Sequence, residues 1–228
     1  MKKYSLFLLF ATLSVFSCTA QKSGSSSEKA KSEGVMKIND YIAGKNYEQY
    51  QVATFAGGCF WCTEASFERI QGVVDVISGY SGGPETYPGY YEVARASTGH
   101  AEAIQVYFDP EVVSFETLLD VLFVAHDPTT LNRQGPDIGP QYRSAIFFHN
   151  AEQKAAAEKT IKKLNDEKAF SKPIVTELTP YDMFWTAETY HQDFYAQNPR
   201  QGYIVSVSKP KVKKVEKTFK SILKKAYK

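Results

Sequence analysis

The chain has 228 residues, of which 43% are hydrophobic and 23% charged, which is enough for one sizeable core and excludes collagen-like, wholly disordered and multi-domain chains. The formal net charge is +2, but residues 209–228 carry nine lysines against one glutamate, so the rest of the chain is net acidic. A nucleic-acid partner is therefore not expected.

Residues 1–18 resemble a secretory signal. A basic start precedes an apolar run from Leu6 to Phe16, which is shorter than the about 20 apolar residues that a membrane-spanning helix needs. The last four residues of this segment, Val-Phe-Ser-Cys, resemble a bacterial lipoprotein signal, in which the cysteine becomes acylated. We therefore expect lipid on Cys18 and an extracytoplasmic, membrane-anchored lipoprotein of the periplasm or cell surface. An ordinary signal peptide, cut near Ala20, is the alternative.

Residues 19–46 are predicted to be a flexible tether, because up to Val35 they are rich in Ser, Lys, Glu and Gly and nearly lack large apolar groups. The folded domain is expected over 47–208. Residues 209–228 then place apolar side chains at helical spacing, which predicts a basic amphipathic helix. We expect this helix to pack on the core with a solvated cationic side, and contact with an anionic membrane surface is the alternative.

Within the domain, short strands and helices follow one another. Strands are predicted over 51–56, 73–78, 102–108, 142–149 and 174–178. Helices are predicted over 59–70, 115–125, 151–168 and 187–197, the last three with Ser114, Asn150 and Thr186 as N-caps. Two segments rich in Gly and Pro, 79–91 and 126–141, are expected to be irregular. This mixed order predicts an α+β fold, a mixed α/β sandwich with a mainly antiparallel sheet covered by helices.

The sequence Gly-Gly-Cys-Phe-Trp-Cys at 57–62 carries the clearest chemical signal. The two glycines allow a sharp turn from strand to helix, so Cys59 is expected in the first helical turn, where backbone N–H groups stabilise a thiolate. Cys62 lies one turn further along the same face, within reach of a disulfide if the turn loosens slightly. Inert structural cysteines are one alternative. A zinc site is another, although the four histidines show no paired spacing.

Other motifs follow in consistent order along the chain. They are Y-x-E-V from Tyr90, T-G-H-A-E-A-I at 98–104, H-D-P at 126–128, N-R-Q-G-P-D-I-G-P-Q-Y-R-S-A-I at 132–146 and A-E-x-Y-H-Q-D-F from Ala187. Together with G-G-C-F-W-C-T-E they resemble the A-type peptide methionine sulfoxide reductases from about Val52 to Tyr203. The resemblance implies a repair enzyme that reduces the S epimer of methionine sulfoxide in oxidised proteins and small molecules. We expect a monomer without metal or organic cofactor.

The resemblance also implies how the reaction is divided among side chains. A sulfoxide sulfur is a poor electrophile until its oxygen is protonated or strongly hydrogen-bonded, so a nucleophile and an acid are both needed. Cys59 is the nucleophile and Glu102 is the acid, which must lie in an apolar pocket that raises its pKa. Tyr90 and Tyr142 donate their hydroxyl groups to the sulfoxide oxygen.

Further motif residues are assigned by position. Asp137 is expected to orient active-site groups and water, as the corresponding carboxylate does in the family. Phe60 and Trp61 flank the nucleophile and are expected to contact the S-methyl group of the substrate. Glu188 and His191 are expected to be hydrogen-bonded helix residues outside the site.

The expected cycle ends in a disulfide. Cys59 becomes a sulfenic acid, which condenses with a second thiol. Many relatives carry that thiol near the C-terminus after a Gly-Tyr pair, but here Gly202 and Tyr203 are followed by Ile204, so Cys62 is expected to resolve the sulfenic acid, as in relatives with a C-F-W-C motif. Thioredoxin or a thioredoxin-fold reductant is implied as the outside dithiol.

Two other functions stay open on sequence alone. A general dithiol–disulfide oxidoreductase is one, because the C-x-x-C of a thioredoxin-like protein also opens a helix after a strand. A sulfoxide-binding or adhesion module that has lost activity is the other. Release of methionine from a sulfoxide substrate would separate the expected enzyme from both.

Overall fold

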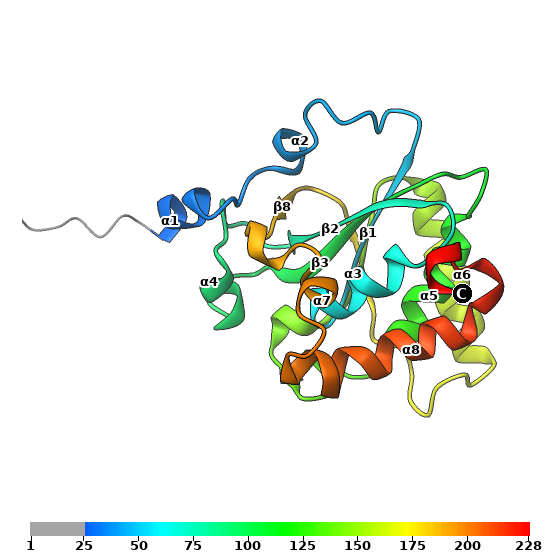
Figure 1. Ribbon diagram of the computed structural model, residues 1–228. Helices are drawn as coiled ribbons and strands as arrows, with labels where there is room; N and C mark the ends of the chain where they lie inside the picture. The colour runs from blue at the N-terminus through cyan, green and yellow to red at the C-terminus, as the bar shows by residue number, and fades with distance from the viewer. Residues whose placement is uncertain (1–25) are drawn as a thin grey trace, which may run out of the picture.

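A single six-stranded sheet organises the computed structural model, which describes residues 26–228 (Figure 1). Its spatial order is β7-β6-β1-β3-β2-β8, and every neighbouring pair is antiparallel except β6 and β7. The strands are β1 (Gln51–Gly57), β2 (Val73–Ser81), β3 (Ala101–Phe108), β6 (Ser144–Phe148), β7 (Glu177–Pro180) and β8 (Phe184–Thr186). The predicted α+β fold with a mainly antiparallel sheet is therefore confirmed.

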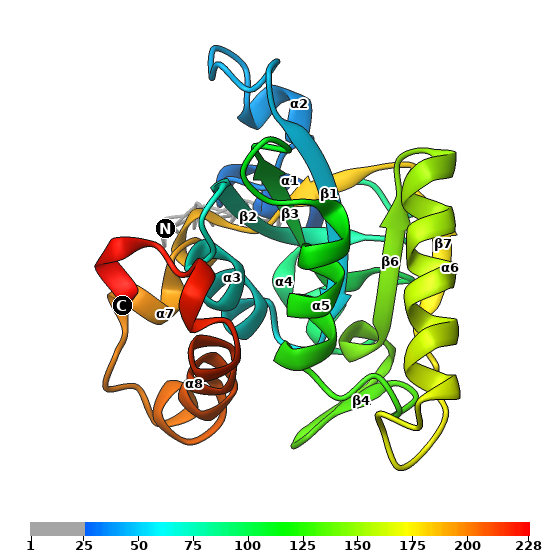
Figure 2. The same cartoon turned by 90° about the vertical axis from the view of Figure 1, so that its right-hand side faces the viewer.

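Helices lie on both sides of this sheet. They are α1 (Ser26–Ser32), α2 (Ile38–Tyr41), α3 (Phe60–Glu68), α4 (Tyr90–Ala94), α5 (Phe115–Ala125), α6 (Ala151–Asp166), α7 (Phe194–Gln197) and α8 (Lys209–Thr218). α3, α5 and α8 contact one another on one side of the sheet, as Figure 2 shows. β4 (Arg133–Gln134) and β5 (Asp137–Ile138) form a separate two-stranded ladder inside the predicted irregular segment 126–141.

Two predicted helix N-caps are confirmed. The Ser114 hydroxyl accepts a hydrogen bond from the Thr117 amide at 3.2 Å, and the Asn150 side chain accepts one from the Gln153 amide at 2.8 Å. Each satisfies an N–H group that the first turn of a helix leaves without a partner. α5 and α6 therefore begin where the sequence predicts.

The predicted helix over 187–197 is wrong. Thr186 does not cap a helix but ends β8, where it pairs with Gly79 of β2. Its amide donates to the Met36 carbonyl at 2.9 Å, so its backbone is already used in extended pairing. The chain continues as a 3₁₀ turn at Thr189–His191 and the single-turn α7.

Every residue of β3 is buried, on both faces of the sheet. One face packs on the helices through a core that includes Ile104, Val106 and Phe108. The other face contributes Ala101 and Ala103 to a second core, which the N-terminal segment covers through Ile38. The centre of the sheet is thus shielded from water on both sides, which matters for the carboxyl group at position 102.

Residues 26–46 differ from the predicted flexible tether. Ala30, Val35 and Ile38 are buried, and Lys37 forms a backbone bridge to Trp185. The buried apolar side chains and the backbone contacts to β8 hold this segment against the rest of the protein. The prediction of a flexible tether is therefore wrong for residues 26–46. The predicted signal over 1–18, with Cys18, and the start of the tether lie outside the described residues. Within residues 26–228 no helix is long and apolar enough to cross a membrane.

The C-terminal segment forms a shorter helix than predicted. α8 ends at Thr218 and is followed by 3₁₀ turns at Lys220–Ile222 and Lys225–Tyr227. Beyond these residues, Leu223 pairs with Ile70 in an isolated bridge, so the chain after α8 stays on the body of the protein. Val212 and Val215 are fully buried, so α8 packs its apolar side on the body of the protein.

Candidate active site

A strand, a glycine turn and a helix start position the first cysteine. β1 ends at Gly57, Gly58 has a φ of +89°, and Cys59 is the N-cap residue of α3. A Cβ atom at Gly58 would lie 2.5 Å from Cγ of the buried Gln134, so both the left-handed backbone and the space require glycine. Cys59 therefore stands at the helix start, one position before the predicted first turn.

The same helix start contacts Glu102. β3 lies beside β1, and the Phe60 amide donates a hydrogen bond of 3.0 Å to Oε2 of Glu102. Only 2% of Glu102 is exposed. Burial raises the pKa of this carboxyl to about 8, against the opposing effect of the Phe60 amide, so Glu102 is mostly protonated at neutral pH.

A cavity of about 240 Å³ joins these groups to others from distant parts of the chain. Its lining comprises Cys59, Phe60, Trp61, Tyr90, Glu102, Asp137, Tyr142, Gln201 and Tyr203. All the predicted site residues of the domain are present except Cys62. The cavity is smaller than the usual pocket for a drug-sized ligand, so it suits one side chain or a small molecule.

Two tyrosines line the cavity from separate segments of the chain. Tyr90 is the first residue of α4, and Tyr142 ends the 3₁₀ turn Pro140–Tyr142. Burial raises the pKa of Tyr90 to about 12 and also raises the pKa of Tyr142. Both hydroxyls are thus O–H donors at neutral pH, near a carboxyl that is also protonated.

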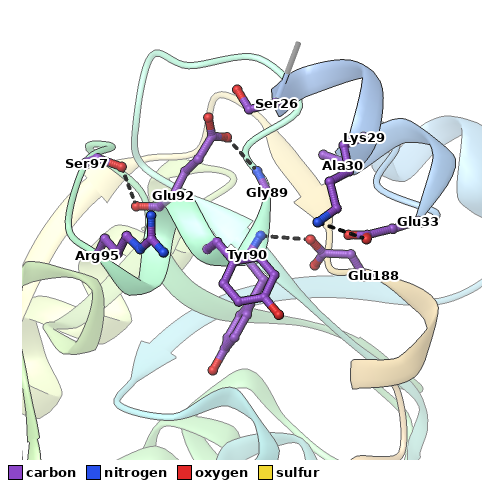
Figure 3. Close-up of a pocket in the computed structure, with 11 residues that line it drawn as sticks. Ser26, Lys29, Ala30, Glu33, Gly89, Tyr90, Glu92, Arg95, Ser97 and Glu188 are labelled. Atoms are coloured by element: carbon purple, nitrogen blue, oxygen red, sulfur yellow. Dashed lines mark hydrogen bonds and ion pairs between the residues drawn. The ribbon is translucent and has the colours of Figure 1, made fainter. Parts of the chain in front are cut away.

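Glu188 holds Tyr90 in place. Its Oε1 accepts the Tyr90 amide at 2.7 Å, and its Oε2 accepts the hydroxyl of the buried Tyr80 at 2.8 Å. Figure 3 shows the first contact at the edge of a neighbouring cavity of about 320 Å³, which Tyr90 also lines and where Ala30 and Glu33 of the N-terminal segment lie close by. Glu188 therefore has the structural role expected of it, although it precedes a 3₁₀ turn rather than lying in a helix.

The indole of Trp61 forms a wall that is fixed from two sides. It stacks on Phe194 with ring centroids 3.9 Å apart and an angle of 11°. Its Nε1–H donates to Nδ1 of His191 at 3.1 Å. Burial lowers the pKa of His191 to about 4, so the imidazole is neutral and can accept this bond. Phe60 is more deeply buried and packs between Tyr80 and His191.

Sequence reasoning missed two lining residues, Gln201 and Tyr203. The Tyr203 hydroxyl donates to Oδ2 of Asp137 at 2.5 Å, and a hydrogen bond from Tyr203 also lowers the pKa of Cys59. Asp137 is thus linked to the cysteine through Tyr203. Tyr203 lies beyond the last motif used in the sequence analysis. Its Gly-Tyr pair was considered there only because many relatives carry a cysteine after such a pair, and this chain does not.

The two thiols have unlike surroundings. Cys59 lines the cavity, whereas Cys62 does not, and its Sγ lies 3.1 Å from the Ser208 hydroxyl. Burial, reinforced by Cys62, raises the pKa of Cys59. The hydrogen bond from Cys59 lowers the pKa of Cys62 to about 7, with further help from Lys211 and Ser208 and against the effect of burial. In the free site the proton therefore resides on Cys59.

This distribution differs from the predicted thiolate at Cys59. The prediction relied on free amides at the start of the helix, but the Phe60 amide is bonded to Glu102 instead of to sulfur. A nucleophilic role for Cys59 therefore requires that this thiol give up its proton. Among the described residues, no group of three or more His, Cys, Asp or Glu side chains is arranged to hold a metal ion.

Comparisons of the sequence give one consistent match. Residues 51–223 match a family model described as peptide methionine sulfoxide reductase. The peptide methionine sulfoxide reductase MsrA 1 of Rhodopirellula baltica is 56% identical over 169 residues, which cover 74% of this chain and 87% of the relative. The peptide methionine sulfoxide reductase MsrA of Thermus thermophilus is 49% identical over 173 residues, which cover 76% of this chain and 97% of the relative.

Solved structures agree with the sequence matches. The reduced form of Mxr1 from Saccharomyces cerevisiae superposes with a TM-score of 0.61 at 34% identity, covering 67% of this chain and 88% of that one. Methionine sulfoxide reductase A of Corynebacterium diphtheriae superposes with a TM-score of 0.60 at 32% identity, covering 68% of this chain and 77% of that one.

Proposed function

Since the chain belongs to the peptide methionine sulfoxide reductase family, we propose that the cavity at Cys59 receives the oxidised side chain of methionine. The protein is an oxidoreductase that reduces methionine S-sulfoxide to methionine at the expense of thiols, and so repairs oxidative damage. The observation that carries the proposal for the site is the shared lining of one small cavity. Cys59 lies there together with the buried, protonated carboxyl of Glu102.

The first step is attack of sulfur on sulfur. Glu102 gives its proton to the sulfoxide oxygen while Cys59 Sγ bonds to the substrate sulfur, and the Cys59 thiol proton returns to the carboxylate. The hydroxyl then passes from the substrate sulfur to Cys59 Sγ: the substrate's sulfur–oxygen bond and the new sulfur–sulfur bond break while a sulfur–oxygen bond forms on Cys59. Methionine leaves, and Cys59 is left as a sulfenic acid. The substrate sulfur gains the two electrons that the Cys59 sulfur loses.

The cavity residues support this step. Tyr90 and Tyr142 supply neutral O–H donors beside the carboxyl, which favours the charge that develops on the sulfoxide oxygen. The Trp61 indole is held rigidly by its two aromatic neighbours and offers an apolar, polarisable surface for the S-methyl group. Asp137 orients Tyr203 toward the cysteine.

The second step assigns the resolving role to Cys62, as in C-F-W-C relatives. Cys62 shares a hydrogen bond with Cys59, and within the described residues these two are the free cysteines. Cys62 attacks the sulfenic acid, a disulfide forms, and water leaves. An outside dithiol, thioredoxin or a thioredoxin-fold protein, then reduces the disulfide and becomes oxidised itself.

The place of the enzyme is a further part of the proposal. The signal-like residues 1–18 and the cysteine at position 18 support export and a lipid anchor in the periplasm or at the cell surface. The reductant must then act outside the cytoplasm, or receive its electrons from a relay across the membrane. Mass spectrometry of the mature N-terminus tests this point: an acylated Cys18 is expected, and an N-terminus beyond that residue would contradict the anchor.

Separate S and R epimers of methionine sulfoxide provide the test of the activity. With dithiothreitol as reductant, the protein should release methionine from the S epimer and not from the R epimer. A scrambled-disulfide protein serves as the competing substrate, and its reshuffling without methionine release would instead identify a general dithiol oxidoreductase.

A further inference from the structure

Cys62 faces a part of the protein that takes no part in lining the cavity. Its Sγ contacts the hydroxyl of Ser208, a fully buried residue that ends the π-helical turn Ile204–Ser208. α8 follows directly and runs along α3, as Figures 1 and 2 show. π-helical turns are rare and often occur at functional sites. The turn here places a hydroxyl against the second thiol.

Lys211 adds a charge to the same surroundings. It lies three residues after Ser208, which precedes α8 in helical conformation, so the two side chains lie on the same side of the chain. Its Nζ atom is buried and has no hydrogen-bond partner among residues 26–228. A buried ammonium group without a partner is unfavourable, and a nearby anion relieves that cost. After the hydrogen bond from Cys59, the Lys211 charge is the largest influence that favours a thiolate at Cys62.

The other ionisable groups around Cys62 include no second cation. The titratable and charged groups that face it come from α3, β3, β5, α7, the π-helical turn region and α8, and are Cys59, Glu102, Asp137, Tyr195, Tyr203 and Lys211. Lys211 is the single cation in this set, and the Asp137 carboxylate raises the pKa of Cys62. The positive charge that favours a thiolate at Cys62 therefore comes from α8.

We propose that Ser208 and Lys211 are positioning residues of the resolving step, which hold Cys62 Sγ as the anion that attacks the sulfenic acid on Cys59. The proposal rests on the proposed function, because it concerns the intermediate which that function creates. The C-terminal helix is then part of the reaction machinery, although it is remote from the substrate cavity.

Atoms and electrons balance in this step. Cys62 reacts as the thiolate, after its proton has passed to solvent, and its Sγ bonds to Cys59 Sγ. The sulfur–oxygen bond of the sulfenic acid breaks, and the departing hydroxide takes a proton from the neutral carboxyl of Glu102 to leave as water. Both cysteine sulfurs end in the disulfide, and no further oxidant is needed.

Lys214 offers a matched control. It lies one turn beyond Lys211 and lines the same outer cavity of about 330 Å³, together with His126 and Gln134. Both lysines lower the pKa of His126 after the larger effect of burial, but Lys211 is the one that acts on Cys62. Loss of either side chain removes one positive charge from α8. A difference between the two variants would therefore result from the position of the lysine and not from the net charge.

The experiment follows one turnover without a dithiol. Wild type, Lys211→Met, Lys211→Arg, Ser208→Ala and Lys214→Met are mixed with free methionine S-sulfoxide between pH 6 and pH 9 and quenched at intervals. Released methionine reports the first step. Dimedone labelling of Cys59 and mass spectrometry of the disulfide report the second.

In Lys211→Met the disulfide should form about five-fold more slowly at pH 7, and its pH midpoint should rise by about one unit, because less Cys62 is ionised. Ser208→Ala should shift the midpoint in the same direction by a smaller amount. Lys211→Arg should restore the wild-type profile, and Lys214→Met should match it.

Disulfide formation at the wild-type rate and midpoint in Lys211→Met would overturn the proposal. Equal slowing in Lys214→Met would overturn it as well, because the effect would then be one of net charge. A wild-type protein that releases no methionine would instead reject the proposed function, so the two failures give different results.

Discussion

Cys59 and Cys62 lie one turn apart at the start of α3, yet they face two different environments. The first is 5% exposed and lines a cavity built by strands, turns and short helices from across the chain. The second is 2% exposed and faces the π-helical turn and α8. Burial is nearly the same for both thiols, so burial does not explain how they differ.

The difference comes from the neighbours of each sulfur. Around Cys59 they are O–H donors and a protonated carboxyl, which suit a ligand with a partly negative oxygen. Around Cys62 they are a hydroxyl and an ammonium group, which suit an anionic sulfur. The start of a single helix thus presents one thiol to the substrate cavity and the other to the interior of the fold. Replacing each cysteine by serine should therefore affect different steps of the reaction.

The largest effect is expected at the sulfur that faces the cavity. Cys59→Ser should abolish release of methionine even in a single turnover, because among residues 26–228 no other thiol lines the cavity beside Glu102. Chromatography of methionine after mixing with one equivalent of sulfoxide is the measurement. Thermal unfolding of the variant provides the control for folding. Release of a substantial fraction of the wild-type amount of methionine would mean that Cys59 is not the nucleophile.

Replacement of Cys62 by serine should leave the release of methionine intact. Cys62→Ser should release one equivalent of methionine per protein and then stop, because the described part of the chain then offers no second thiol to condense with the sulfenic acid on Cys59. Turnover driven by a dithiol donor is the second measurement, and it should be lost. If the variant sustains thioredoxin-driven turnover, Cys62 is not the resolving cysteine.

Glu102→Gln should lower the rate of methionine release by about 100-fold at pH 7, in the usual range for loss of a general acid. Glutamine keeps the shape and can still accept the Phe60 amide, so the backbone contact is preserved. The wild-type pKa of about 8 means that the acid form is present below that pH and is lost above it. The wild-type rate should therefore fall as pH rises through about 8.

The glutamine variant should lack this decline between pH 7 and pH 9. Single-turnover rates at closely spaced pH values in constant ionic strength test both points. A parallel decline in Glu102→Gln would assign the wild-type profile to another group, such as one of the two cysteines.

The sequence predicts local features well where a short motif fixes the backbone. Ser114 and Asn150 cap the helices predicted for them because the cap depends on a residue and an amide only three positions apart. The same local reasoning fails at Thr186, where pairing with Gly79 of β2 and with Met36 decides the conformation. A strand partner that lies more than 100 residues away leaves no signal in the local sequence.

The candidate site shows the same limit. The motif residues identify all but two of the cavity-lining side chains, yet Tyr203 carries no pattern of its own and enters through the path of the chain after α7. The proton distribution between the cysteines was also beyond the sequence. It depends on which group receives the Phe60 amide and on the approach of α8 to Cys62, and both are tertiary contacts.

The smallest expected effect is on the accessibility of Cys62, which α8 shields from solvent. Val215 is fully buried, and Val215→Ala removes packing worth about 2 kcal/mol of the free energy of unfolding. Because the loss falls on α8, the helix should open more often than the rest of the protein. Cys62 should then react with iodoacetamide about three-fold faster at pH 7.5, a modest change for a local opening. Cys59 should react as before.

Val106→Ala provides the comparison for that change, since Val106 is equally buried but lies in the centre of β3. Its cost in unfolding free energy should be similar, measured by denaturant titration, while the alkylation rate of Cys62 should stay at the wild-type value. Mass spectrometry of the alkylated sites separates the two rates. Equal acceleration in both variants would mean that Cys62 is reached by global unfolding, and that α8 does not guard the second sulfur separately from the fold as a whole.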